Sequence, residues 1–148
     1  MKKELIDKEY DAFKRFVSWA CENGARPIDA LPESHPIRIL EQAEGIAPHS
    51  ALKKGLREAI NDIIEKFSAW PEERVKAADE DLKQLGGPTL TEMRMLFALD
   101  LKRIENRGKI ETEEECFLVR NALEMPMIQA SHKRVEKFRE MLYEYEFG

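Results

Sequence analysis

The fold is decided by residues 93–101, MRMLFALDL, the middle of the most apolar helical segment of the chain. Thr89 and Glu92 precede this stretch with the spacing of a capping box, in which a hydroxyl and a carboxylate satisfy N–H groups at the start of a helix. Gly108 follows it and can adopt the left-handed conformation that ends a helix. These signals predict a helix over about 90–107. Because its middle is apolar nearly all round, we expect it to form the buried centre of a helical bundle.

On both sides of this helix, apolar residues recur with the 3.6-residue period of amphipathic helices. The periodic segments cover about residues 3–22, 36–44, 51–70, 72–85, 113–123 and 128–145. Pro71 gives the third and fourth of these a tight junction, which favours an antiparallel hairpin. Breaks in the pattern lie at Gly24, Gly86-Gly87, Gly108 and Pro126. The pieces between these breaks are too short for one long coiled coil.

The composition agrees with a helical fold. Half of the 148 residues are Ala, Glu, Lys, Leu or Arg, whereas Val and Thr together supply only 7. Sheets prefer branched and aromatic side chains, so this composition favours helices. A chain of this length has room for one domain that buries roughly 70% of its unfolded surface. We therefore predict an all-α fold: a compact single-domain bundle of six or seven helices over 1–148, with an irregular, proline-rich segment at 24–50.

Charge, hydropathy and cysteines limit the class of partner and the compartment. The sequence has no apolar run long enough to span a membrane. Its net charge is −5, and residues 101–148 carry 9 basic and 10 acidic side chains, so the last third lacks the basic surplus typical of nucleic-acid binding. Cys21 and Cys116 have no metal-ligand spacing, and the first residues lack the apolar region of a signal peptide. We expect reduced thiols in a cytoplasmic protein.

The leading hypothesis for function is a cytoplasmic protein–protein interaction module without catalysis: a homo-oligomer, an adaptor or a regulatory subunit. No phosphate-binding loop, nucleophile elbow, HExxH motif or di-iron Glu-x-x-His pair occurs, so we expect neither cofactor nor metal. Methionine and tyrosine are enriched at protein interfaces. The candidate contact residues are Met125, Met127, Tyr143, Tyr145 and Phe147. The alternative is that these side chains pack into the core beneath the first helix.

A second hypothesis places a small enzyme, or a protein that binds a ligand or metal, at a cleft between segment 24–50 and the bundle. If the segment folds back, His35 and His49 could approach each other and supply groups that titrate near neutral pH. A histidine beside a proline is also common as a helix cap or a surface residue. The candidate residues of this cleft are Cys21, Arg26, His35, Arg38 and His49.

A third hypothesis is nucleic-acid binding through the last helix, which carries Lys133, Arg134, Lys137 and Arg139. Acidic residues alternate with these basic ones, which favours a solvated face with internal ion pairs. His132 and Glu136 lie four residues apart in the same helix, and we interpret them as a surface pair rather than as two metal ligands.

Two acidic features of the sequence have a structural interpretation that we prefer to a functional one. Asp100 lies within the apolar helix, and burial of a lone carboxylate costs several kcal/mol. We expect it to pair with an arginine or to lie at the rim of the core. The acidic cluster at 111–115 surrounds Thr112, and acids in a first helical turn complement the helix dipole. We expect this cluster to cap a helix.

Overall fold

A computed structural model of the protein describes residues 2–26 and 30–148, with side chains from Glu9 onward. Most residues in these ranges lie in helices, and no strand occurs in them. The α-helices are α1 (Lys2–Ala20), α2 (Pro36–Ala43), α3 (His49–Lys66), α4 (Glu72–Gln84), α5 (Leu90–Arg107), α6 (Glu113–Leu123), α7 (Pro126–Gln129) and α8 (His132–Phe147). A π-type turn, Cys21–Ala25, and a 3₁₀ turn, Pro32–Ser34, complete the elements. The predicted all-α bundle is confirmed.

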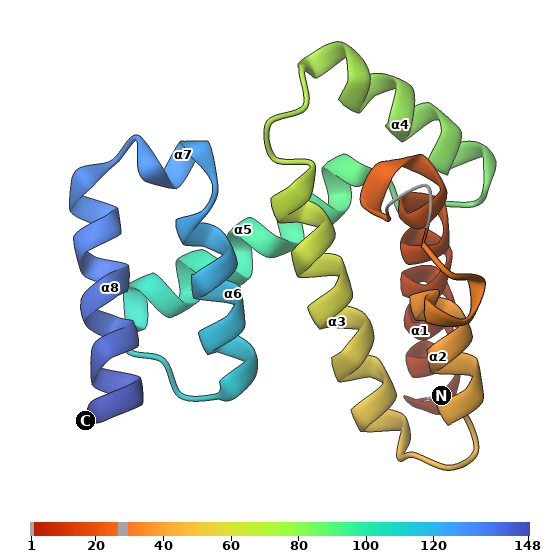
Figure 1. Ribbon diagram of the computed structural model, residues 1–148, viewed down its shortest axis with the longest axis horizontal. Coiled ribbons are helices and arrows are strands. Elements are labelled where there is room, and N and C mark those ends of the chain that lie inside the picture. The colour runs from red at the N-terminus through yellow and green to blue at the C-terminus, as the bar shows by residue number, and fades with distance from the viewer. Residues whose placement is uncertain (1, 27–29) are drawn as a thin grey trace.

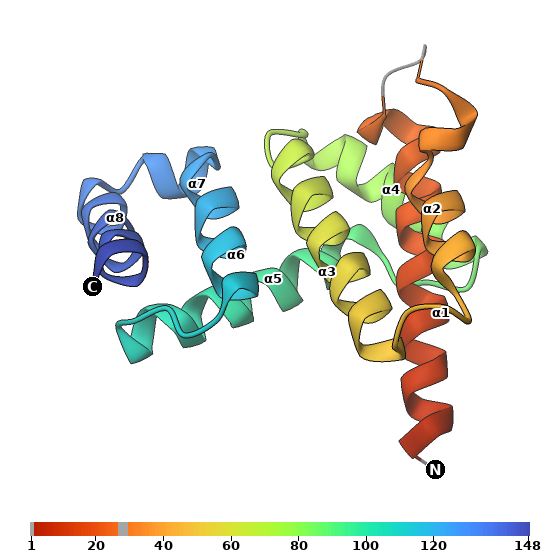
Figure 2. The ribbon, with the colours of Figure 1, turned by 60° about the horizontal axis from the view of Figure 1, so that its bottom comes forward.

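The helices form two groups that are joined by α5. Helices α1 to α4 lie at one end of the molecule and α6 to α8 at the other, and α5 runs between them (Figure 1). The view in Figure 2 shows the same division from a second direction. Helix α5 contacts α3, α4 and α6, and α3 also contacts α6. The predicted central position of the helix at 90–107 is therefore confirmed.

Local signals set the ends of α5 and α6. The Thr89 hydroxyl accepts a hydrogen bond from the Glu92 N–H at 3.1 Å, and the Thr112 hydroxyl does the same for Glu115 at 3.1 Å. Such a cap stabilises a helix by about 1 kcal/mol. Gly108 ends α5 with φ +82°, in the left-handed region that favours glycine. Both capping boxes in the sequence therefore start a helix at the predicted residue.

The core is continuous through both groups of helices. Its buried apolar side chains form one cluster, with contributions from helices on either side of α5. The largest fully buried side chains are Phe16, Val17, Phe67, Leu82, Leu90, Ile104, Val119 and Phe138. Full burial of a side chain of this size contributes about 1.5–3 kcal/mol. The two groups are therefore stabilised by shared apolar burial rather than by the connecting helix alone.

The predicted antiparallel hairpin of α3 and α4 is wrong. Helix α4 packs mainly on α5, and it runs away from the end of α3 instead of lying along it (Figure 1). Its apolar stripe, Val75, Ala78 and Leu82, is buried in that arrangement. The Asp79 carboxylate also accepts a hydrogen bond from the Thr91 N–H at 3.0 Å, which joins α4 to the first turn of α5.

The predicted helix at 128–145 is two helices. Single-turn α7 ends at Gln129, and the Ser131 hydroxyl accepts a hydrogen bond from the Arg134 N–H at 3.4 Å, which begins α8. The chain changes direction here, so that α7 lies across the end of α6 and α8 runs back along it (Figure 1). Within residues 2–26 and 30–148, no helix has the length and hydrophobicity that crossing a bilayer requires.

Candidate partner-binding groove

Helix α5 is buried on one face and exposed on the other. Met93, Phe97 and Leu101 pack into the core, whereas Met95 is 61% exposed and Leu99 is 59% exposed. Leu96 beside them is 48% exposed. The expectation of burial all round is therefore wrong for this helix. A helix that joins two groups is covered only where they meet it, and the remaining apolar side chains face outward.

A groove of about 430 Å³ runs along the exposed side of α5. It is lined by Ile64 and Ser68 at the end of α3, by Thr91, Arg94, Met95, Phe97, Ala98 and Leu101 of α5, by Met125, Pro126, Met127 and Ile128, and by Arg134 of α8. From Thr91 to Leu101 the helix axis advances about 15 Å at 1.5 Å per residue. The groove therefore has the volume and the mostly apolar lining, with a few polar groups, that are typical of binding sites.

Methionine is the most frequent residue type in the lining of this groove. Three of the six methionines in the chain line it, namely Met95, Met125 and Met127. The side chain of methionine is unbranched and polarizable, so it adapts to partners of different shape. Met127 is 82% exposed, but Met125 is 9% exposed and belongs to the core. The groove therefore has a firm floor and one adaptable wall.

The charged residues that line the groove are two arginines in different settings. The Arg134 guanidinium is paired with both carboxylate oxygens of Glu105, at 2.9 and 3.3 Å. The half-buried Arg94 guanidinium donates from Nη2 to the carbonyl oxygen of Phe67 at 2.6 Å. Within the described residues, Arg94 forms no ion pair. Burial lowers the pKa of Arg94, and the nearby Asp79 carboxylate opposes this effect.

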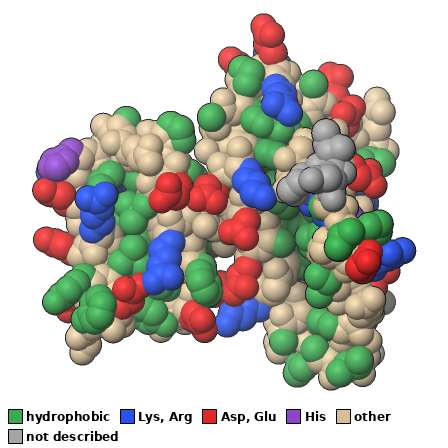
Figure 3. Space-filling model, viewed as in Figure 1, with side chains coloured by type: hydrophobic (Ala, Val, Ile, Leu, Met, Phe, Trp, Pro, Cys, Tyr) green, Lys and Arg blue, Asp and Glu red, His purple; other side chains and the backbone are tan. Residues whose placement is uncertain are grey.

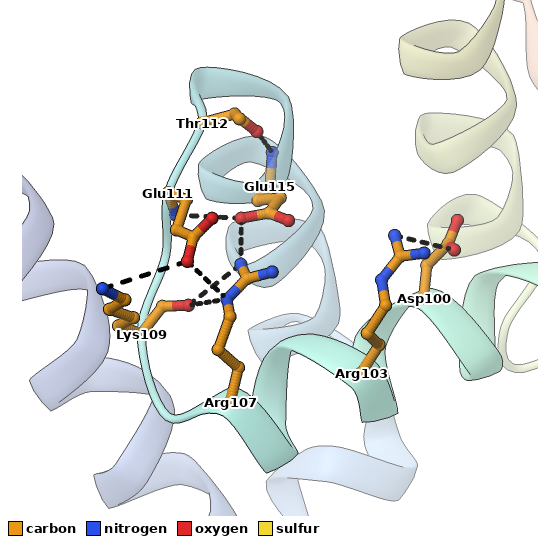
Figure 4. A network of polar contacts seen from close by, with 7 residues as sticks. All are labelled: Asp100, Arg103, Arg107, Lys109, Glu111, Thr112 and Glu115. Atoms are coloured by element: carbon orange, nitrogen blue, oxygen red, sulfur yellow. Dashed lines mark hydrogen bonds and ion pairs between the residues drawn. The ribbon is translucent and has the colours of Figure 1, made fainter.

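The acidic features of the sequence are structural, as predicted. Figure 4 shows the Asp100 carboxylate beside Arg103, one turn along α5, with 3.3 Å between them. It also shows Glu115 between Arg107, the N–H of Glu111 and the cap of α6. Burial acts to raise the pKa of Glu115, but these hydrogen bonds and the charge of Arg107 hold it below its usual value. The cluster caps α6.

The structure does not bring the two predicted histidines together. His35 caps α2, where its Nδ1 accepts a hydrogen bond from the Ile37 N–H at 3.1 Å. His49 begins α3, and its ring packs against Tyr10 with 5.0 Å between centroids. Because α2 and α3 run in opposite directions, their first residues lie at opposite ends of α2 (Figure 2), roughly 12 Å apart along its axis.

The other predicted cleft residues have separate surroundings. Burial raises the pKa of the Cys21 thiol, which leaves it protonated and weakly nucleophilic at neutral pH. Arg26 holds its own loop by donating to the Leu31 carbonyl at 2.7 Å and the Ser34 hydroxyl at 3.0 Å. Arg38 is exposed on α2. Among the described residues, no group of three or more His, Cys, Asp or Glu side chains is placed to hold a metal ion.

A polar hollow of about 440 Å³ lies beside His49, lined also by Tyr10, Asp11 and Glu44. The buried Tyr10 hydroxyl has no hydrogen-bond partner among the described residues. Burial raises the pKa of Tyr10, and the Glu44 carboxylate adds to this effect from nearby. Lys14 already neutralises Glu44 at 3.0 Å. Of the predicted cleft residues, only His49 lines this hollow.

The predicted contact residues at the end of the chain are exposed and lie away from the groove. Tyr143, Tyr145 and Phe147 lie in the last turns of α8, and the rings of Tyr143 and Phe147 contact each other at 5.1 Å. Figure 3 shows hydrophobic side chains at the surface over this end of the molecule. Tyr143 and Phe147 form a second apolar surface, separated from Met127 by the length of α8.

The last helix presents mixed charges. His132 and Glu136 form the predicted surface pair, with 3.0 Å between Nε2 and Oε1. Arg134 is turned toward Glu105 of α5, so it is withdrawn from any basic stripe with Lys133 and Lys137. Sequence reasoning missed Met95, Leu99 and Arg94 as surface residues. Residues 93–101 are hydrophobic on all faces of the helix. This pattern does not distinguish a helix that is buried all round from one that is covered on a single face.

No protein-family model, no curated protein and no solved structure matches this chain. The groove and its surroundings are therefore the basis for assigning a function.

Proposed function

We propose that the protein is a cytoplasmic, non-catalytic interaction module that binds an α-helical segment of a partner protein in the groove beside α5. The observation that carries this proposal is the exposure of Met95 and Met127 along one apolar groove. Soluble proteins seldom leave large apolar side chains together at a hollow unless the surface binds something. The two free thiols, Cys21 and Cys116, support a reducing compartment.

The dimensions and chemistry of the groove suit a helix. An amphipathic helix lays an apolar stripe into a groove through residues at i, i+3, i+4 and i+7, a span of about 10 Å. The groove is about 15 Å long beside α5, which is enough for two to three turns. Methionine-lined walls are typical of grooves that receive helices, because they repack around the incoming side chains.

Binding of displayed peptides to the purified chain would test this function. A library of amphipathic helices about 18 residues long, with a fixed Leu/Phe stripe and varied polar positions, spans the groove with about one turn to spare at each end. We expect selection of helices that bind the wild-type protein. Their affinity should fall at least tenfold with Met95→Asp or Met127→Asp, since each change puts a charge into the apolar contact.

Phe147→Asp is the matched control, because Phe147 is exposed and apolar but lies on the second surface. Equal loss of binding with Phe147→Asp and Met127→Asp would assign the contact to neither surface and would contradict the proposal. Light scattering of the unbound chain adds a further readout. If the protein forms a dimer that Met95→Asp dissociates, the groove receives a second copy instead of a foreign helix.

A further inference from the structure

Arg94 is a half-buried cation whose only hydrogen bond in the described part of the chain goes to a neutral carbonyl, that of Phe67. A guanidinium has five N–H donors, so several remain for another acceptor. From this geometry we infer that the helix bound in the groove places a carboxylate on Arg94, so that the partner is an amphipathic helix with an acidic residue at one end of its apolar stripe. The inference rests on the proposed function and names the chemistry of the partner.

The burial of Arg94 is what makes an acidic partner favourable. A charge removed from water without an opposite charge is unfavourable, and a carboxylate that arrives with a ligand relieves that cost. Arginine and carboxylate can form two parallel hydrogen bonds, which are stronger than bonds between neutral groups. Burial lowers the pKa of Arg94, in agreement with a cation that is short of hydration.

The Asp79 carboxylate does not already fill this role. Asp79 is close enough to influence Arg94, but its two carboxylate oxygens accept from the N–H and the hydroxyl of Thr91. Asp79 is thereby held at the start of α5 as a link between helices. Within the described residues it forms no ion pair with Arg94.

The position of Arg94 also predicts the orientation of the bound helix in the groove. Arg94, Thr91 and Ser68 lie at the end of the groove where α5 begins, and Arg134 lies toward the other end, where it pairs with Glu105 of α5. Arg134 is already paired with Glu105, so it gains less from a new carboxylate. A single acid on the partner should therefore be preferred at the Arg94 end. This asymmetry fixes the direction in which the helix lies.

Peptides that differ only in one charged group give the test. From the helices selected above, the terminal position that faces Arg94 would be made Glu, Gln or Lys in otherwise identical synthetic peptides. We expect Glu to bind about tenfold more tightly than Gln to the wild-type protein, because a hydrogen bond between two charged groups is stronger than one to a neutral amide. The preference should vanish with Arg94→Gln and persist, reduced, with Arg94→Lys, which keeps the charge but loses the paired donors.

Arg134→Gln is the matched control, and it should leave the preference for Glu unchanged. Equal affinity of the Glu and Gln peptides for the wild-type protein would overturn the inference and leave the proposed function standing. If Arg134→Gln and not Arg94→Gln removes the preference, the acid lies at the wrong end and the inference fails. If no amphipathic helix binds at all, the proposed function itself fails. Circular dichroism of each variant shows that it is folded, and the peptide comparison on wild-type protein needs no variant.

Discussion

Arg15 of α1 donates a hydrogen bond to the carbonyl oxygen of Gly86, 71 residues later, at 3.2 Å. The same Nη1 also lies within 3.5 Å of the carbonyl oxygens of Leu85 and Gly87. These three residues form the turn after α4, in which the N–H of Gly87 donates to Leu82 at 2.7 Å and that of Gly86 to Lys83 at 3.0 Å. This is a Schellman motif, and Arg15 binds its outward carbonyls. It ties the first helix to the turn that leads into α5.

Substitution at this turn should reveal coupling between the two residues. Gly86 has φ +94°, so Gly86→Ala should lower the free energy of unfolding by about 1 kcal/mol. A Cβ atom there would also lie 2.8 Å from Arg15 Nη1 and displace it. Arg15→Met should lower the same free energy by about 0.5–1.5 kcal/mol. Because Gly86→Ala already disturbs the Arg15 contact, the double variant should lose less than the two changes added together.

Urea denaturation of the four proteins measures this coupling. Gly108→Ala is the control, since Gly108 has a similar φ and a Cβ atom added there would meet no other atom within 4 Å. Its effect should add fully to that of Arg15→Met. Strict additivity for Gly86→Ala as well would show that Arg15 does not bind the turn in solution.

Glu115 should make stability depend on acid pH. Its pKa is below the usual value in the folded protein, so it contributes stability that is present above its unfolded pKa of about 4.3 and is lost as the pH falls through the folded value. Glu115→Gln should therefore lower the free energy of unfolding by about 1 kcal/mol at pH 7. The difference from wild type should shrink as the pH falls below about 4.3 and through the folded pKa, because the wild-type carboxylate then takes up its proton.

Glu113→Gln is the control for this pH dependence. Glu113 lies in the same first turn of α6 and shares the helix-dipole effect, but it is exposed and is not bonded to Arg107. We expect its effect to be at most half of that of Glu115→Gln in thermal melts at pH 7. Equal effects of the two changes would assign the stabilisation to the dipole alone.

At the seam between α3 and α6, stability should depend on pH in the opposite sense. Acidic side chains gather where these helices lie side by side (Figure 3). Burial raises the pKa of Glu65, and Asp62 and Glu124 add to the rise. A raised folded pKa favours the protonated form, so the stability is fully present below the unfolded pKa and is lost as the pH rises through the folded value. Glu65→Gln should therefore stabilise the protein at pH 7 by a few tenths of a kcal/mol.

Thermal melts at pH 7 and pH 4 measure this gain, which should shrink at the lower pH because the wild-type carboxyl then takes up its proton. Glu72→Gln is the control, since Glu72 is exposed and pairs with Lys76 in α4. That change should give no gain at either pH. A destabilised Glu65→Gln variant would show that the seam is not repulsive.

The ends of the helices were predictable from the sequence where one local contact sets them. The hydroxyl of Thr89 needs only the N–H of Glu92, three residues away, and Gly108 needs only its own backbone freedom. The break between α7 and α8 also has a local signal, the cap at Ser131. That signal was outweighed because Ile128 and Val135 continue the apolar period across it.

The groove could not be predicted, because it depends on which surfaces meet. The sequence of α5 shows that Met93, Met95, Phe97 and Leu99 are all apolar, but not that α3, α4 and α6 cover one face only. The direction of α4 was hidden for the same reason. Its apolar stripe can pack on either neighbour, and the contact between Asp79 and Thr91 across the turn selects α5.

Met125 and Met127, two residues apart at the groove, should separate stability from binding. Met125 is 9% exposed and Met127 is 82% exposed, so only the first contributes to the core. Met125→Ala should lower the free energy of unfolding by about 2–4 kcal/mol, because the cavity left behind is not refilled. Met127→Ala should change it by at most about 0.5 kcal/mol, yet it should weaken binding of a selected helix. Urea denaturation and peptide titration of both variants measure this. If Met127→Ala destabilised the fold as much as Met125→Ala, Met127 would be a core residue and the groove would lose its adaptable wall.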